Sequence, residues 1–323
     1  TQGLSLKHSF VPHPLIKNGH LQTIVANYYG DVDPPESKRE LISLPDGDKI
    51  ALEVSTPKDW SNKCPTVLLV HGLGGSSNSP YIKRVAHRII EKGGRAIRMN
   101  LRGSGSGKGL AKKGYHGGIS ADLKEVIHRI YDKHPLSPIS VVGFSLGGNI
   151  TLKLLGEDDS IDRYLERAVA VCPAIHLEDS ARRFEKFSNR IYQRSFLNCL
   201  VDIVSEQKEH FPDALLDSLE KCKTLYEFDE IFTAPFFGFE SAKDYYTKSS
   251  AIHLIPNIKL KTHILFAKDD PLVNGSLLNP QDLPGHIELM VTERGGHMGF
   301  LGHTKRGPFR WMDYQIMQWL ELY

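Results

Sequence analysis

The pentapeptide Gly143-Phe144-Ser145-Leu146-Gly147 constrains the fold more than any other part of the chain. It has the form G-x-S-x-G, it follows an apolar β-branched run at residues 139–142, and it precedes a helix-like segment at residues 148–155. A serine between a strand and a helix occupies a sharp turn with unusual backbone angles, and the flanking glycines let the two elements approach closely. The pattern predicts a nucleophile elbow that raises the Ser145 hydroxyl above a sheet. The alternative interpretation is an ordinary glycine-rich turn.

A serine at such an elbow needs a base to take its proton and a carboxylate to orient that base. Two strand-like runs, at residues 261–267 and 286–291, are followed closely by Asp270 and by His297. Side chains just past the carboxyl ends of parallel strands meet at one edge of the sheet. We therefore predict a catalytic triad of Ser145, Asp270 and His297. The two glycines before the histidine predict a mobile turn that lets its ring move.

An oxyanion hole is the remaining part that acyl transfer requires, since two aimed N–H groups stabilise the charge on the former carbonyl oxygen. The apolar run at residues 66–70 leads into a loop of the form H-G-x-G-G at residues 71–75. We predict that the backbone amides of Leu73, in this loop, and of Leu146, after the serine, form the hole. His71 is interpreted as a structural residue that holds the loop.

The order of the elements predicts an α/β fold with a doubly wound, mainly parallel sheet, because strands and helices alternate along much of the chain. The alternation stops after the sixth strand, at residues 168–172, where a helical and aromatic stretch follows. We expect an N-terminal extension at residues 1–38, an α/β core at residues 39–173 and 251–323, and a helical cap, or lid, inserted at residues 174–250.

Aromatic residues are frequent in the predicted cap, and most of them are expected to form its own small core. Some are expected to face the serine and to bind an apolar acyl chain, since burying each methylene is worth about 0.8 kcal/mol. The stretch Phe236-Phe237-Gly238-Phe239 is the one we assign to the cleft. Phe236, Phe237 and Phe239 are therefore the predicted substrate-binding residues.

Composition excludes several classes of function. A net charge of +2 over 323 residues gives no basic footprint for nucleic acid. The four cysteines are far apart and form no C-x-x-C pair, which predicts free thiols in a reducing, cytoplasmic setting and no structural metal. No apolar run reaches the roughly 18 residues that span a bilayer, and no signal-peptide pattern opens the sequence. We expect no cofactor; contact with a membrane surface and the oligomeric state stay open.

The glycine-rich segment at residues 103–109 superficially resembles a phosphate-binding loop. A Walker A motif would need glycine at position 102 and serine or threonine at position 109, where the chain has Arg102 and Gly109. We interpret this segment as a flexible turn near the rim of the site. His20 and His116 are interpreted as structural; for His20 the alternative is an N-terminal arm that touches the mouth of the cleft and binds substrate.

Six segments spread over almost the whole chain carry a wider resemblance: residues 14–24 (PLIKNGHLQTI), 100–105 (NLRGSG), 115–118 (YHGG), 143–149 (GFSLGGN), 269–271 (DDP) and 295–299 (GGHMG). In combination they resemble the YheT-like branch of the α/β-hydrolases, which includes plant embryogenesis-associated and mammalian abhydrolase-domain esterases. The resemblance implies hydrolysis of carboxylic esters, often lipid-like or with short-to-medium acyl chains. It also implies that the acid is the aspartate before the proline, Asp270 rather than Asp269.

The resulting hypothesis is a serine esterase that acts through an acyl-enzyme on a small ester substrate. Thioesterase, amidase and acyltransferase reactions use the same apparatus and remain alternatives. So do lyase or cofactor-free haloperoxidase chemistry on this fold, and a non-catalytic binding protein in which the cap blocks entry.

Overall fold

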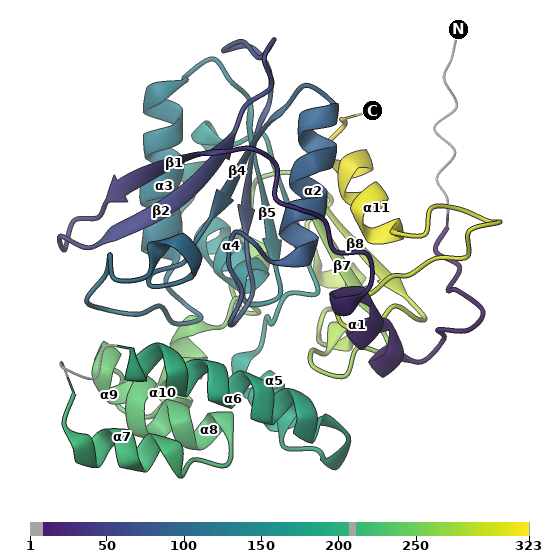
Figure 1. The fold of residues 1–323 in the computed structure, drawn as a ribbon. Coiled ribbons are helices and arrows are strands. Elements are labelled where there is room, and N and C mark those ends of the chain that lie inside the picture. The colour runs from purple at the N-terminus through teal and green to yellow at the C-terminus, as the bar shows by residue number, and fades with distance from the viewer. Residues whose placement is uncertain (1–8, 207–210, 323) are drawn as a thin grey trace, which may run out of the picture.

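Eight strands form one sheet at the centre of the molecule, in the order β1-β2-β4-β3-β5-β6-β7-β8 (Figure 1). The computed structural model describes residues 9–206 and 211–322. β2 pairs antiparallel with β1 and β4, and every other pair is parallel, which confirms the mainly parallel sheet. The strands are β1 (Lys38–Ser43), β2 (Lys49–Ser55), β3 (Thr66–Val70), β4 (Arg95–Met99), β5 (Ile139–Phe144), β6 (Arg167–Val171), β7 (Thr262–Ala267) and β8 (Ile287–Thr292).

The inner strands β3 to β7 are buried at every position. Short apolar, β-branched runs of this kind are typical of parallel strands with helices on both faces. α2 packs against α11 and α3 packs against α4, and the two pairs cover opposite faces of the sheet (Figure 1). These helices are α2 (Pro80–Glu91), α3 (Ser120–Lys133), α4 (Leu146–Glu157) and α11 (Trp311–Trp319).

In the described part of the chain, six α-helices lie between β6 and β7 and cover the carboxyl ends of the strands (Figure 1). We call this segment, residues 174–250, the cap, and its treatment as a unit separate from the core remains our interpretation. Its helices are α5 (Leu177–Phe184), α6 (Arg190–Ser205), α7 (Asp213–Glu220), α8 (Leu225–Phe228), α9 (Ala234–Phe237) and α10 (Ala242–Ser249), with a π-helical turn at Asp229–Thr233.

A helix in the N-terminal extension, α1 (Gly19–Tyr28), is one that the sequence does not predict. Its buried face consists of the small or polar residues Gly19, Gln22, Thr23 and Ala26, whereas Tyr28 on the opposite face is 84% exposed. An apolar stripe that points inward is the usual sign of a surface helix, and here that sign is missing. α1 lies beside the carboxyl ends of β7 and β8 (Figure 1).

Short 3-10 turns complete the described structure, at Gly105–Gly107, Ile161–Tyr164, Phe187–Asn189, Ile255–Asn257, Gly275–Leu277 and Pro280–Asp282. Among the helices of the described residues, none combines the length and the hydropathy needed to cross a membrane.

Candidate active site

Ser145 sits at the turn between β5 and α4 with φ 52° and ψ −116°, a conformation that is rare for a residue with a side chain. The turn is possible because its neighbours are small. A Cβ on Gly147 would lie 2.5 Å from the carbonyl oxygens of both Val70 and His71, so the start of α4 packs directly on the end of β3. The backbone N–H of Ser145 donates to Val171 O on β6 at 2.9 Å. The strand–turn–helix geometry of an elbow is therefore present.

The three side chains predicted from distant parts of the sequence meet at this turn. His297 Nε2 lies 2.9 Å from Ser145 Oγ, and His297 Nδ1 lies 2.8 Å from Asp270 Oδ2. The other oxygen of Asp270 accepts the backbone N–H groups of Leu272 and Val273, at 2.8 and 3.1 Å. Asp270 and His297 are only 4% and 6% exposed. A carboxylate held in this way fixes the imidazole with one nitrogen facing the hydroxyl.

Asp269, the neighbouring acid, does not reach the imidazole of His297. Its Oδ1 accepts the backbone N–H of Gly296 at 2.9 Å, and its Oδ2 is buried without a hydrogen-bond partner among the described residues. Burial raises the pKa of this carboxyl group. The geometry thus separates two adjacent aspartates, with Asp270 on the histidine ring and Asp269 on the backbone before it.

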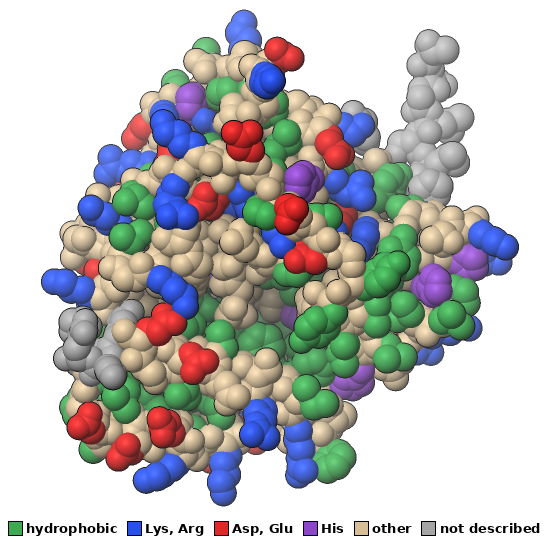
Figure 2. Space-filling view, in the orientation of Figure 1, with side chains coloured by type: hydrophobic (Ala, Val, Ile, Leu, Met, Phe, Trp, Pro, Cys, Tyr) green, Lys and Arg blue, Asp and Glu red, His purple; other side chains and the backbone are tan. Residues whose placement is uncertain are grey.

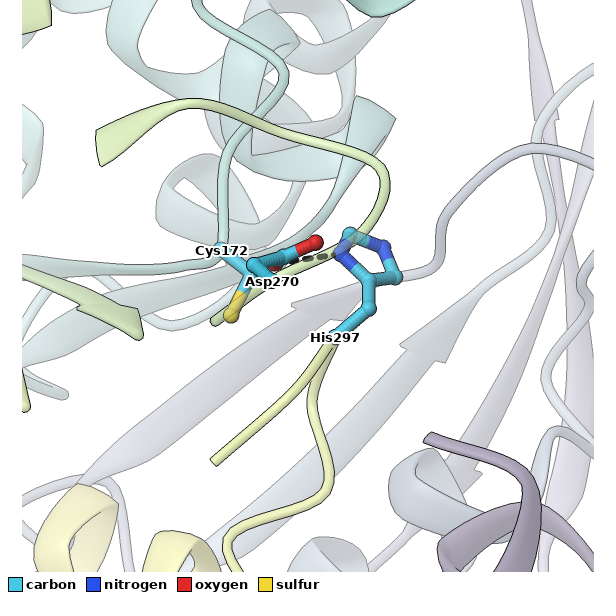
Figure 3. Close-up of side chains that lie close together, drawn as sticks. All are labelled: Cys172, Asp270 and His297. Atoms are coloured by element: carbon cyan, nitrogen blue, oxygen red, sulfur yellow. Dashed lines mark hydrogen bonds and ion pairs between the residues drawn. The ribbon is translucent and has the colours of Figure 1, made fainter. Parts of the chain in front are cut away.

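Cys172 lies behind the acid, at the end of β6. Figure 3 shows the Asp270 carboxylate between the Cys172 thiol and the ring of His297, with the ion pair on the histidine side. Ligand-type atoms of these three residues lie within 4.8 Å of one another, a spacing that could accommodate a metal ion. Here Nδ1 of His297 is already bonded to Asp270, and burial raises the pKa of the thiol well above its usual value. The donor set therefore fits a proton relay better than a metal site.

The two predicted oxyanion donors lie in the loop after β3 and at the start of α4. The amides of Gly72 and Gly74 donate to the hydroxyls of Tyr81 and Tyr115, at 3.0 and 2.9 Å. The amide of Leu73 between them, like that of Leu146, has no hydrogen-bond partner in the part of the chain that the structure describes. A Cβ on Gly72 would fall 3.1 Å from Ser145 Cβ, so this loop lies against the serine.

His71 is fully buried and holds this loop to the segment that follows β4. Its Nε2 accepts the N–H of Leu101 at 3.0 Å, and Nδ1 donates to Gly72 O at 2.7 Å. Burial lowers the pKa of the ring to about 4, so it stays neutral at ordinary pH. These contacts support the structural interpretation.

The turn that carries His297 is closely packed, which argues against the mobile glycine turn that the sequence suggests. Gly295 and Gly296 have φ 147° and 59°, and a Cβ on Gly296 would collide with Gly19 O on α1. Gly296 is required because α1 packs against this backbone, and Gly295 is required because a Cβ there would meet the ring of Phe300. Both contacts argue for a held turn rather than a swinging one.

A cavity of about 120 Å³ opens beside Ser145 and His297, and most of its wall comes from the cap. Figure 2 shows a hollow in this face of the molecule, between the core and the cap, with hydrophobic side chains around it. The cap contributes apolar residues from several helices, among them Leu177, Ala181, Phe184, Phe196, Leu200, Val204, Phe228 and Phe232. Many residues expected to form the cap's own core therefore also line the cavity.

Of the three phenylalanines predicted to bind substrate, Phe236 and Phe237 line this cavity, and Phe239 does not. The ring of Phe239 packs instead on His116 and Tyr245, with centroids 5.4 and 5.2 Å apart. Gly238, which lies between Phe237 and Phe239, has φ 80°, so the chain turns before Phe239.

The cavity wall also contains the half-buried carboxylate of Asp229. Asp229 accepts the hydroxyls of Thr233 and Tyr246, both at 2.6 Å, and burial raises its pKa to about 6. His116, on the core side, is neutral because burial lowers its pKa to about 4. Asp229 and His116 are therefore both mainly neutral between about pH 4 and pH 6.

Several supporting residues escape sequence reasoning. The hydroxyls of Tyr81 and Tyr115 accept the amide N–H groups on either side of Leu73. Nothing in the local sequence signals this role for Tyr81, and the only signal for Tyr115 is its place in the YHGG segment. Asn149 donates to Gly117 O and Ser249 O and accepts from the Ala251 N–H, so it ties α4 to the end of the cap. Its only signal is its place in the GFSLGGN segment.

Comparison with known proteins identifies the family. A family described as "alpha/beta hydrolase fold" matches residues 65–304. "Putative esterase YheT" of Escherichia coli is 31% identical over 97% of this chain and 93% of its own length. The human "Phospholipase ABHD3" is 28% identical over 94% of this chain and 76% of its own. A Pyrococcus furiosus esterase structure, Pf2001, shares the fold with a TM-score of 0.57 at 17% identity, over 98% of this chain and 99% of that one. The chain therefore belongs to the α/β-hydrolase fold family, in its YheT-like branch.

Proposed function

We propose that this protein hydrolyses carboxylic esters with an apolar acyl chain, using Ser145 as nucleophile, His297 as base and Asp270 to orient the imidazole. The observation that carries the proposal is the unbroken relay from Ser145 Oγ to His297 Nε2, at 2.9 Å, and from His297 Nδ1 to Asp270 Oδ2, at 2.8 Å. Family membership supports ester hydrolysis as the reaction class.

The reaction proceeds in two steps. His297 takes the proton of Ser145 as the oxygen attacks the ester carbonyl, and the amides of Leu73 and Leu146 stabilise the oxyanion. The imidazolium gives its proton to the leaving alcohol, which leaves an acyl-serine. Water then loses a proton to His297, attacks the acyl carbon and releases the acid, and the proton returns to the serine.

The cavity supports the choice of an apolar acyl group, because its cap wall is built mainly of aliphatic and aromatic side chains. Each buried methylene contributes about 0.8 kcal/mol, so two added methylenes improve binding about tenfold while the chain still fits. Relatives named as an esterase and as a phospholipase agree with such a substrate class.

Ser145→Ala tests the nucleophile. We expect it to abolish p-nitrophenyl ester hydrolysis and labelling by a fluorophosphonate probe while the melting temperature stays close to wild type. Ser140→Ala, which removes a buried hydroxyl from the same strand, is the matched control and should keep both activities. Undiminished turnover by Ser145→Ala contradicts the assignment.

Adding an alcohol acceptor to the wild-type reaction separates hydrolysis from acyl transfer.

Phe237→Ala tests the acyl pocket, with Phe239→Ala as its control. Both rings contact His116, but only Phe237 lines the cavity. A series of p-nitrophenyl esters of increasing length should change its optimum in Phe237→Ala and keep it in Phe239→Ala. The opposite pattern would move the acyl site to another part of the cap.

A further inference from the structure

We propose that Thr23 and Gln22 of α1 are positioning residues for the reaction, because they fix the backbone of the loop that carries the base. We call residues 295–302 the histidine loop. The proposal rests on the proposed function only in taking His297 as that base. α1 lies outside the segment matched by the family, residues 65–304, so the core of the fold does not itself supply these contacts.

The histidine loop has an unusual backbone. Gly295, Gly296, Met298 and Phe300 have φ of 147°, 59°, 57° and 44°. Positive φ values at residues with side chains cost energy and persist only where the surroundings hold them in place. The loop thus needs contacts from outside, and α1 provides them.

Thr23 is joined directly to the backbone of the base. Its hydroxyl accepts the N–H of His297 at 2.8 Å and donates its proton to Gly19 O at 2.7 Å, so it joins the base to the first turn of α1. The threonine is 3% exposed. Removing the hydroxyl would leave the His297 N–H buried without a partner, and that group would shift to find one.

Gln22 makes a two-sided contact further along the loop. Its amide oxygen accepts the N–H of Leu301 at 2.6 Å, and its NH2 group donates to Leu301 O at 3.1 Å. The preceding segment adds a backbone pairing, in which His303 N–H donates to Val11 O and His13 N–H donates to Leu301 O, both within 2.9 Å. The N-terminal segment therefore holds the loop on both sides of Phe300.

Close packing between backbones leaves the loop little freedom. A Cβ on Gly296 would collide with Gly19 O, and a Cβ on Gly299 would lie 2.7 Å from the backbone of Gln22. This explains the unusual polarity of α1, which turns its polar residues inward. Those residues serve as partners for a loop whose N–H and C=O groups have no sheet to join.

The rate of the reaction depends on the position of the His297 ring, because this ring makes two short contacts at once. The ring of His297 must reach Ser145 on one side and Asp270 on the other, and a displacement of about 1 Å in such a site can cost about 100-fold in rate. Loss of the Thr23 hydroxyl should therefore lower kcat and leave KM almost unchanged, since Thr23 itself does not line the cavity.

Thr23→Val, which keeps the shape of the side chain, is the test, and Thr23→Ser is the rescue variant. Thr66→Val is the matched control, because Thr66 is also buried, is bonded to Ser137 and Arg95, and lies at the far end of β3. The measurements are kcat and KM on a p-nitrophenyl ester, the rate of fluorophosphonate labelling, and the melting temperature. We expect kcat and labelling to fall ~10–100-fold in Thr23→Val, with KM little changed, and to recover most of their value in Thr23→Ser.

The control separates positioning from general destabilisation. The proposal is overturned if Thr23→Val and Thr66→Val lose the same activity for the same loss of melting temperature, or if Thr23→Ser is as slow as Thr23→Val. Failure of the proposed function looks different, since Ser145→Ala would then keep its turnover and wild type would not react with the probe.

Discussion

The two halves of the site are built in different ways. The elbow around Ser145 forms between neighbouring elements, β5 and α4, and its unusual φ of 52° is supported by the adjacent strand β3. The histidine loop follows the edge strand β8 and is held by Thr23, a residue 274 positions away in the sequence. One half is a local structure set into the core, and the other is an irregular loop that depends on a distant helix.

This difference shows where the site is vulnerable. The contacts of the elbow lie within the central sheet, so we expect them to break only when the core unfolds. Histidine-loop contacts are few, specific and made by the N-terminal segment, so single substitutions on α1 can loosen the base without unfolding the core. The following predictions test that contrast, from the largest expected effect to the smallest.

Asp270→Asn asks whether the ring of His297 is oriented by its acid even when α1 is intact. We expect kcat to fall about 10⁴-fold, because an amide supports the wrong tautomer. Asp269→Asn keeps an acceptor for the Gly296 N–H and should cost less than about tenfold. Steady-state kinetics on one ester decide the matter, and a larger loss in Asp269→Asn would mean that the other aspartate is the acid.

Gly147→Ala tests the elbow with a similarly small change, the addition of one methyl group. The added Cβ would lie 2.5 Å from Val70 O and His71 O, so the start of α4 and the Leu146 amide must move. Losing one oxyanion donor typically costs about 10²–10³-fold in kcat. Gly156→Ala, in the last turn of the same helix, would collide with the backbone of Leu254 instead, so it controls for an equally severe clash at the other end of α4. Normal kinetics in Gly147→Ala would contradict the tight local construction of the elbow.

Gln22→Met should affect the histidine loop and spare the elbow. We expect kcat to fall about tenfold, since Leu301 loses both side-chain partners but the Thr23 contact stays. Hydrogen–deuterium exchange should speed up at residues 295–303 and remain unchanged at residues 143–151. Gln315→Met, a buried glutamine on α11, is the control. Equal acceleration in both segments would remove the contrast between them.

The pH dependence of stability gives the smallest effect. Burial raises the pKa of Asp269 in the folded protein above its value in the unfolded chain. The folded state therefore holds this proton more tightly, and the stability that Asp269 contributes is present at low pH and is lost as the pH rises through the folded-state pKa. Asp269→Asn does not titrate, and its melting temperature should therefore gain on wild type between about pH 4 and pH 8. A difference that stays constant over this range would show that Asp269 does not titrate as buried.

Sequence reasoning succeeded where neighbouring residues decide the backbone. Glycine spacing around Ser145 and the β-branched run before it predict the turn, and apolar runs predict the parallel strands. The same reasoning brings Asp270 and His297 to one edge of the sheet, because parallel strands end together there. Sequence alone leaves the choice between Asp269 and Asp270 to a resemblance, whereas the hydrogen bonds of the fold separate them.

Tertiary structure decided what depends on contacts across the chain. The inner face of α1 is polar, so no hydrophobic periodicity predicts that helix. The role of its polar residues is recognisable only in the folded structure, where Thr23 and Gln22 form hydrogen bonds with the histidine loop. Whether Phe237 or Phe239 faces the cavity depends on one left-handed glycine between them. Adjacent residues determine short-range steric effects, and these can be predicted from the sequence. A hydrogen bond between residues 23 and 297 forms only after the folding of the whole sheet has brought them together.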